Sequence, residues 1–311
     1  MSSKPKILVA CKDPGGAEAL SPVVLKLISE GEVEITSIGY KFSEDVFKKR
    51  KIPFKKLEDF NITEISPTTM EYLLDKEKPD LVVLGTSLGR SIEDDIVLAA
   101  RKMKIKTFAL LDFWNNYSQR FSCLETNKRL AFLPDFIGVM DEFTKEEMIK
   151  EGFEPERLLI TGQPYFDGLF ELAKTFDKEK VIQFRDELNI SNSDILISFF
   201  SQPLTKTRPN SADEPGYLGY TQLTILNSLI KALYILKKDL GRPITLFVKL
   251  HPKETPDEID DLISGKTIGI AVDKNIDPRK LMLSSDIVCG MFTMILVEAF
   301  LIRKKVLSIQ I

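Results

Sequence analysis

The chain of 311 residues contains few of the side chains that build metal centres and disulfide frameworks. Its three cysteines, Cys11, Cys123 and Cys289, are far apart and odd in number, and no two of them have the spacing of a metal-binding pair. Reduced thiols in a cytoplasmic protein are the simplest interpretation. The sequence also has only one histidine, so we predict no metal site.

Long apolar runs and an excess of one charge sign are missing as well. No stretch reaches the ~18 consecutive apolar residues of a membrane span, and the first ten residues do not have the pattern of a signal peptide. Lys and Arg number 43 against 46 Asp and Glu, with the two signs interspersed. This balance argues against a nucleic-acid partner. Peripheral contact with a membrane through a surface patch stays open.

Short apolar runs alternate with amphipathic stretches along the whole chain. Uninterrupted apolar runs are typical of strands that helices cover on both faces, and strand–helix alternation favours parallel sheets. The strands are expected at residues 6–11, 35–40, 81–85, 106–111, 136–140, 158–161, 195–201, 245–250, 268–272, 287–290 and 305–309. The helices are expected near residues 17–29, 92–102, 144–151, 167–174, 179–188, 221–238 and 292–302, whereas residues 41–69 show no clear order.

A chain of this length exceeds one hydrophobic core, so we predict two α/β domains. Residues 1–164 would form an N-terminal Rossmann-like domain, and residues 165–311 a C-terminal one. The linker is expected within residues 162–168. Ligands of such sheets bind at the carboxyl ends of the strands, so the candidate site residues are sought there.

The first candidate segment follows the first strand and contains Asp13, Gly15, Gly16 and Glu18. Two glycines at a helix start let backbone N–H groups approach a phosphate closely. A tight strand-to-helix turn without a ligand is an equal alternative.

The second segment, residues 111–117, places Asp112 and Asn115 around the only tryptophan, Trp114. Asp112 is a candidate general base that would deprotonate an attacking hydroxyl. The alternative is an aspartate that caps the next helix while Trp114 packs in the core.

The only histidine, His251, lies between Lys249 and Lys253 at a predicted strand end. On an extended backbone, residues at alternate positions face the same way, and an imidazole with two ammonium neighbours would stabilise a diphosphate leaving group. A solvated histidine with surface lysines is the alternative.

Two further strand ends belong to the C-terminal half. Phe292 and Thr293 precede a helix that carries Glu298, which would present amides and a hydroxyl to phosphate and a carboxylate to ribose hydroxyls. Ser201 and Gln202 would bond phosphate or base. The alternatives are a plain N-cap, a solvated glutamate and an ordinary loop entry.

Together these segments resemble the GT-B superfamily, which includes nucleotide-sugar glycosyltransferases, non-hydrolysing UDP-N-acetylglucosamine 2-epimerases and CDP-glycerol glycerophosphotransferases. Residues 14–27 look like the first loop and helix of the epimerases, residues 146–167 like the run into the interdomain linker, and residues 249–252 like an HP element. Residues 285–309 look like the donor-phosphate segment. The resemblance implies two Rossmann-like domains that face each other across a cleft, with residues 1–164 on the acceptor side and residues 165–311 on the nucleotide-sugar donor side. It also implies that His251 contacts the donor phosphates, that Thr293 takes the place of a phosphate-binding serine, and that Glu298 takes the place of the acidic residue on the following helix.

The sequence also departs from these families. Trp114 is followed by Asn115 where the glycerophosphotransferases have WHG, Met291 and Met294 replace an Asp and a Ser of the phosphate segment, and the epimerase DSGG is absent. The chain ends on a predicted strand, where the superfamily continues into further helices. The second domain is therefore expected to be either minimal or incomplete, and we expect exposed apolar surface beside residues 305–309.

The functional expectation is a GT-B-like glycosyltransferase of surface-polysaccharide or glycoconjugate synthesis, with a UDP- or CDP-type nucleotide sugar and a sugar or polyol acceptor as partners. A UDP-sugar 2-epimerase or hydrolase, and a non-catalytic nucleotide-sugar binder, are the alternatives. No cofactor is expected, and an oligomer stays open.

Overall fold

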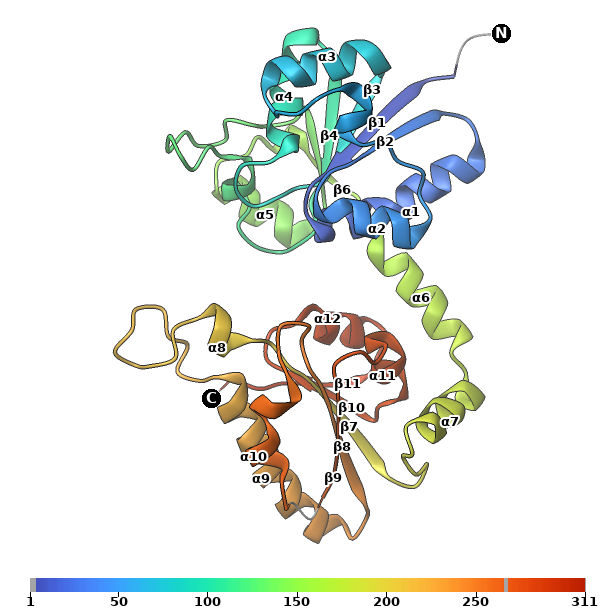
Figure 1. Cartoon of the computed structure of the whole chain (residues 1–311), viewed down its shortest axis with the longest axis vertical. Helices are drawn as coiled ribbons and strands as arrows, with labels where there is room; N and C mark the ends of the chain where they lie inside the picture. Colours follow the sequence, from blue (N-terminus) through green and yellow to red (C-terminus); the bar gives the residue numbers. More distant parts are fainter. Residues whose placement is uncertain (1–3, 266–267, 311) are drawn as a thin grey trace. The chain divides into compact units, whose positions relative to one another are not determined.

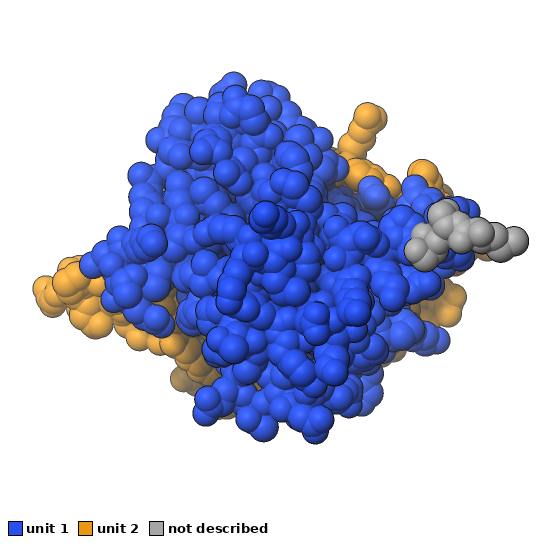
Figure 2. All heavy atoms as spheres, turned by 90° about the horizontal axis from the view of Figure 1, so that it is seen from above, with its two compact units in different colours: residues 1–168 blue, residues 169–311 orange. Residues whose placement is uncertain are grey.

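The computed structural model of the chain describes residues 4–265 and 268–310. The chain divides into two compact units, Met1–Gly168 and Leu169–Ile311. Figure 1 traces the chain, and Figure 2 gives the two units different colours. The helix α6, Tyr165–Thr175, contains the residue at which the units divide, so the end of the expected linker is helical. Within the described residues, no helix is long and apolar enough to cross a membrane.

Unit 1 is built on a six-stranded sheet in the order β2-β1-β3-β4-β5-β6. Every neighbouring pair of strands is parallel. The strands are β1 Lys6–Cys11, β2 Glu34–Gly39, β3 Leu81–Leu84, β4 Lys106–Leu110, β5 Phe136–Val139 and β6 Leu158–Ile160. The crossovers are the helices α1 Pro14–Glu30, α2 Phe42–Arg50, α3 Pro67–Glu77, α4 Ile92–Met103 and α5 Glu142–Lys150, with short 3-10 turns at Leu57–Phe60, Ser118–Phe121 and Pro155–Arg157.

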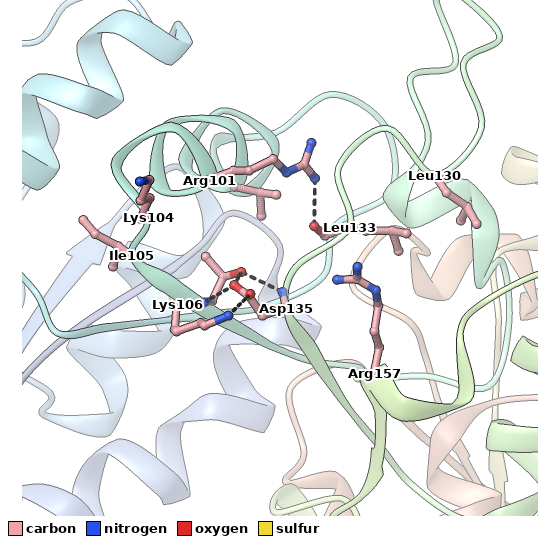
Figure 3. Close-up of a pocket in the computed structure, with 10 residues that line it drawn as sticks. Arg101, Lys104, Ile105, Lys106, Leu130, Leu133, Asp135 and Arg157 are labelled. Carbon is pink, nitrogen blue, oxygen red and sulfur yellow. Dashed lines mark hydrogen bonds and ion pairs between the residues drawn. The ribbon is translucent and has the colours of Figure 1, made fainter.

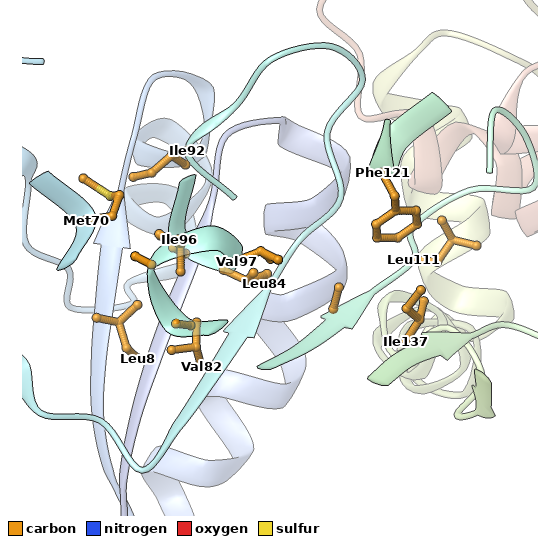
Figure 4. Packing of buried hydrophobic residues seen from close by; sticks show 14 of the residues in the cluster. Leu8, Met70, Val82, Leu84, Ile92, Ile96, Val97, Leu111, Phe121 and Ile137 are labelled. Atoms are coloured by element: carbon orange, nitrogen blue, oxygen red, sulfur yellow. The ribbon is translucent and has the colours of Figure 1, made fainter. Parts of the chain in front are cut away.

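Alternate residues of β1 belong to different apolar clusters, as expected for a strand covered on both faces. Leu8 packs with α3 and α4, where Met70 and Ile96 are fully buried (Figure 4). Val9 belongs to the cluster that contains Leu20 of α1 and Phe47 of α2. Apolar side chains therefore cover both faces of the sheet at β1, and polar side chains are expected at the strand ends.

Unit 2 is built on a five-stranded parallel sheet in the order β11-β10-β7-β8-β9. Its strands are β7 Ile195–Phe200, β8 Ile244–Lys249, β9 Gly269–Asp273, β10 Ile287–Gly290 and β11 Lys305–Ser308. Its helices are α7 Lys178–Glu187, α8 Leu204–Thr207, α9 Gln222–Leu240, α10 Asp260–Ile263, α11 Pro278–Ser284 and α12 Met294–Leu301, with a 3-10 turn at Pro256–Glu258. Its principal core lies between α9 and the strands β7 and β8.

The prediction of two Rossmann-like parallel-sheet domains is confirmed, and each predicted strand lies within one residue of its observed bounds. The sequence analysis missed the helices α2, α3, α8, α10 and α11. In α2, FSEDVFKKR, most positions are charged or polar and only Ser43, Val46 and Phe47 are buried, so the apolar periodicity is too short to indicate a helix. The predicted cleft between the domains stays a prediction.

Apolar side chains are exposed beside the last strand, as expected. Phe300 is 72% exposed and Leu307 46% exposed, whereas Leu301, Val306 and Ile309 are half-buried.

Candidate functional site

Three strands of unit 1 end side by side, and polar residues follow each of them. β1 leads into Asp13, β3 into Thr86 and Ser87, and β4 into Asp112. Because β1, β3 and β4 are parallel neighbours, these segments meet at the carboxyl edge of the sheet. This is the edge at which ligands of α/β sheets bind.

The side chain of Asp112 is held by its neighbours rather than capping a helix. Its Oδ1 accepts hydrogen bonds from Arg120 Nη1 at 2.7 Å and Thr86 Oγ1 at 3.1 Å. Its carbonyl oxygen accepts from Gln163 Nε2 at 2.8 Å. Burial raises the pKa of Asp112, and the charge of Arg120 and the Thr86 hydroxyl only partly offset that rise. The Asp112 carboxyl group is thus held in one orientation, and its pKa is higher than that of an ordinary aspartate.

Gly15 brings the first turn of α1 against this carboxyl group. A Cβ at Gly15 would lie 2.0 Å from Asp112 Oδ2, and a Cβ at Gly16 would lie 3.2 Å from the Cα of Gly85. Any side chain at Gly15 would displace Asp112. The first N–H groups of a helix have no intrahelical partner, so the α1 N-terminus and the Asp112 carboxyl share one polar corner of the sheet.

Glu93 is a residue of this corner that the sequence analysis missed. Its Oε1 accepts hydrogen bonds from Ser87 Oγ at 2.7 Å and from the Lys12 N–H at 3.1 Å, and its Oε2 has no partner among the described residues. Burial raises the pKa of Glu93. After burial itself, the charges of Glu93, Asp112 and Asp13 all help to raise the pKa of the Cys11 thiol.

The other candidates of unit 1 lie less centrally. Asp13 precedes α1 without capping it and accepts a bond from the Leu88 N–H at 3.3 Å. Glu18 forms an ion pair with Arg50, whose Nε lies 2.8 Å from Oε2. Asn115 is exposed. The Glu18 carboxylate is thus ion-paired, and its role at the site stays a prediction.

Trp114 is fixed by contacts within unit 1. Its Nε1 donates to Asp141 Oδ2 at 2.7 Å, and its ring stacks on Phe166 with ring centroids 6.2 Å apart. It packs against the core as a partly buried side chain, as in the alternative interpretation in which Trp114 packs in the core.

In unit 2, hydrogen bonds tie together the ends of three strands. Gln202, after β7, accepts from the Phe292 N–H, after β10, at 3.0 Å. Ser201 Oγ donates to Glu254 Oε1 at 2.8 Å, and the His251 N–H, after β8, donates to Glu254 Oε2 at 2.8 Å. The structure thus brings four predicted residues into two bonded groups at one sheet edge.

Glu254 is the second residue that the sequence analysis missed. It is 1% exposed, and burial raises its pKa while the bonds from His251 and Ser201 lower it. In the sequence it stands in a charged loop that reads as solvated, and the only signal for it is its position three residues after the single histidine.

The imidazole of His251 has a defined hydrogen-bonding state. Its Nδ1 accepts from the Lys253 N–H at 3.1 Å. Burial, followed by the charges of Lys253, Lys249 and Lys274, lowers its pKa. His251 is therefore neutral at neutral pH with its proton on Nε2, and it presents a hydrogen-bond donor.

The extended backbone expected through His251 ends at Lys249, and whether the two flanking lysines face the same way as His251 stays a prediction. β8 ends at Lys249 and the chain turns, with the Glu254 N–H bonded to the His251 carbonyl at 2.9 Å. Lys249 Nζ donates to the carbonyl oxygens of Leu250 and Lys274 at 2.8 and 2.7 Å. Only Lys253 remains exposed, because carbonyl groups hold the ammonium of Lys249.

Thr293 occupies the N-cap position of α12 but makes no capping bond with its side chain. The start of this helix therefore keeps unpaired N–H groups beside the Gln202–Phe292 bond. Glu298 is 3% exposed and bonded to Arg279 Nε at 2.8 Å. It is therefore not the solvated glutamate of the alternative, and its contact with ribose hydroxyls stays a prediction.

Solved structures share this architecture. The UDP-GlcNAc 2-epimerase of Neisseria meningitidis bound to UDP-GlcNAc is 20% identical over 97% of this chain and 82% of its own, with a TM-score of 0.65. A putative UDP-N-acetylglucosamine 2-epimerase of Listeria monocytogenes gives 17% identity, coverage of 98% and 79%, and a TM-score of 0.67. The chain has a GT-B-like fold.

A glycosyltransferase of Rickettsia africae is also similar in fold, at 16% identity, coverage of 99% and 79%, and a TM-score of 0.62. No family model matches the sequence, and no curated protein matches it either. The GT-B-like architecture explains why polar residues collect at two sheet edges, one in each unit. The roles of the individual residues stay predictions.

Proposed function

We propose that the chain is an enzyme that acts on a UDP-sugar, with epimerisation or hydrolysis as its chemistry. The observation that carries the proposal is the Asp112 carboxyl group. Its side chain is 13% exposed, Arg120 and Thr86 orient it, and its pKa is raised at the edge where α/β sheets bind ligands. A carboxyl group of this kind is suited to proton transfer at a sugar carbon or hydroxyl.

Unit 2 supports the diphosphate part of the proposal. The Nε2–H of His251 would donate to a phosphoryl oxygen as negative charge develops on the leaving group, and the start of α12 would bind a second phosphoryl oxygen. Ser201 and Glu254 act indirectly, because they fix the turn that holds His251. No step of this scheme uses a metal ion.

The GT-B neighbours that are named UDP-GlcNAc 2-epimerases favour an epimerase over the glycosyltransferase expected from the sequence. A carboxyl group at Asp112 serves epimerisation without an acceptor, whereas transfer needs an acceptor hydroxyl. Glycosyl transfer remains the second candidate, since the Rickettsia africae neighbour is named a glycosyltransferase.

A panel of UDP-, CDP- and GDP-sugars, incubated with and without sugar or polyol acceptors, tests this proposal. We expect a UDP-sugar to be converted to its epimer, or to UDP and free sugar, without any acceptor. Conversion only with an acceptor would support the transferase. A raised melting temperature without conversion would identify a non-catalytic binder, and no effect of any nucleotide sugar would refute all three.

A further inference from the structure

Unit 1 has a cavity at the amino ends of its strands, opposite the carboxyl ends described above. Its volume is ≈ 490 Å³, which lies in the range of ligand pockets. Figure 3 shows the residues around it. They are Val97, Arg101, Lys104, Ile105, Lys106, Thr107, Leu130, Leu133, Asp135 and Arg157.

The cavity lies at the amino edge of the sheet. Arg101 is in the last turn of α4, Lys106 is the first residue of β4, Asp135 directly precedes β5, and Arg157 directly precedes β6. Asp112 follows the other end of β4. A ligand in this cavity would therefore not contact the polar corner around Asp112.

The lining carries a strong excess of positive charge. It includes four cations and one carboxylate, in a chain whose net charge is -3. Asp135 already accepts bonds from Lys106 Nζ at 2.7 Å, from the Thr107 N–H at 2.9 Å and from Thr107 Oγ1 at 3.0 Å. These bonds use most of the hydrogen-bond acceptor sites of the Asp135 carboxylate, so it does not neutralise the other cations.

The remaining cations are held by carbonyl groups or exposed to solvent. Arg101 Nη2 donates to the Leu133 carbonyl at 3.0 Å, and Arg157 Nη1 donates to the Pro134 carbonyl at 2.8 Å (Figure 3 shows the first bond). Arg157 also pairs with Glu154 through Nε at 2.6 Å, outside the lining. Lys104 forms no ion pair among the described residues and is exposed. Each arginine thus keeps N–H groups for a ligand.

Aliphatic side chains complete the lining. Leu130 and Leu133 come from the loop before β5 and, with Ile105, pack against the core as partly buried residues. Val97 of α4 also lines the cavity and is 4% exposed. An apolar wall beside a cationic rim fits a ligand with one anionic group on an apolar body.

A helix end accounts for only part of this charge. Basic residues in the last turn of a helix commonly complement its dipole, which explains Arg101 and Lys104. It does not explain Lys106 and Arg157, which come from β4 and from the turn before β6. Cations from three elements therefore converge on one cavity.

We propose that this cavity binds a small organic phosphate, whose phosphate group pairs with Arg101 and Arg157 while its apolar part covers Leu130 and Leu133. Bidentate pairing with guanidinium groups is the arrangement that phosphates favour. The inference does not depend on the UDP-sugar proposal, because it concerns the opposite edge of the sheet.

Calorimetric titration at low ionic strength with phenyl phosphate tests this site, with inorganic phosphate and phenol as the charge-only and ring-only probes. We expect saturable binding of phenyl phosphate, weaker binding of inorganic phosphate and none of phenol. The double variant Arg101→Gln/Lys104→Gln, and separately Arg157→Gln, should each lower the affinity for phenyl phosphate at least tenfold. The control Lys150→Gln/Lys174→Gln removes the same charge from exposed lysines that pair with glutamates, and it should bind as the wild type does.

Two results would overturn the site. One is no saturable binding of phenyl phosphate or phosphate to the wild-type protein. The other is equal loss of affinity in the control and the cavity variants, because that would mean net charge alone attracts the anion. Excess UDP should leave phenyl phosphate binding unchanged, and competition by UDP would place the anion elsewhere. Thermal unfolding of each variant confirms that it is folded.

Discussion

Single carboxyl groups illustrate why residue type alone does not reveal a role in this protein. Glu254 and Glu93 both stand in charged segments that read as solvated, yet both are buried and accept hydrogen bonds from strand-end loops. Glu298 was expected to bind ribose but is paired with Arg279. Burial of a carboxylate depends on partners that are distant in sequence, such as Ser201 for Glu254, and local pattern does not contain them.

His251→Ala should reduce nucleotide affinity or turnover at least tenfold while changing stability by less than ~0.5 kcal/mol, as at most surface positions. The reason is that, among the described residues, the imidazole bonds only to the Lys253 N–H, which leaves its Nε2–H for a ligand. UDP affinity and turnover are the measurements. His251→Gln, which can place an amide donor near the Nε2 position, should retain more function than His251→Ala. Wild-type affinity and turnover in both variants would exclude His251 from the site.

Asp94 gives a prediction for the pH dependence of stability. Burial raises its pKa to about 7, so its folded-state pKa exceeds the unfolded value. The stability it contributes is complete below the ordinary aspartate pKa and is lost as the pH rises through about 7. Asp94→Asn, whose amide oxygen can still accept the Ser91 N–H bond, should therefore be more stable than the wild type at pH 8, by on the order of 2–4 kcal/mol. At pH 4 the two proteins should be nearly equal.

Urea unfolding at pH 4, 6 and 8 measures this difference. Lys102→Gln is a suitable control, since it alters an exposed ion pair on the same helix. A constant difference between Asp94→Asn and the wild type across the three pH values would show that folding does not raise the pKa of Asp94.

At the scale of elements, the apolar strands were predictable and the polar helices were not. Each predicted strand is a near-continuous apolar run, because both faces of a sheet in this fold are covered. Helices such as α2 bury few residues and depend on tertiary contact with α1. The turn after β8 was also not foreseen, because the bond between Glu254 and the His251 N–H that stabilises it is not visible in the pattern.

The start of α1 tests whether close packing at Gly15 serves the site. Gly15→Ala would place a Cβ 2.0 Å from Asp112 Oδ2, so the carboxyl group must move from its bonds with Arg120 and Thr86. We expect at least a tenfold loss of UDP-sugar turnover. Gly168→Ala, in α6 with no atom within 4 Å of the added Cβ, is the matched control. The control should keep full turnover and gain ~0.5–1 kcal/mol of stability.

Turnover and melting temperature of both variants decide the outcome. Full activity in Gly15→Ala would mean that the position of Asp112 is not critical, and the proposed role of its carboxyl group would fail.

At the scale of the whole molecule, the sequence predicted the class of fold better than the chemistry. Alternating apolar and amphipathic segments predicted two parallel-sheet units, and the GT-B-like neighbours confirm the fold. The proposed chemistry rests on a few polar contacts, such as Arg120 with Asp112, that the same fold can replace without changing its core. For this reason the fold by itself does not select transfer or epimerisation.

The most direct test of the proposed function is proton NMR of UDP-GlcNAc incubated with the protein in ²H₂O without an acceptor. Inversion at a C–H centre through proton removal introduces solvent deuterium at that carbon, and hydrolysis instead releases UDP. We predict one of these two outcomes for the wild-type protein and at least a 100-fold slower reaction for folded Asp112→Asn, in which the carboxyl group cannot transfer the proton. Unchanged UDP-GlcNAc, with conversion appearing only when an acceptor is added, would contradict the account, as would an Asp112→Asn variant that reacts at the wild-type rate.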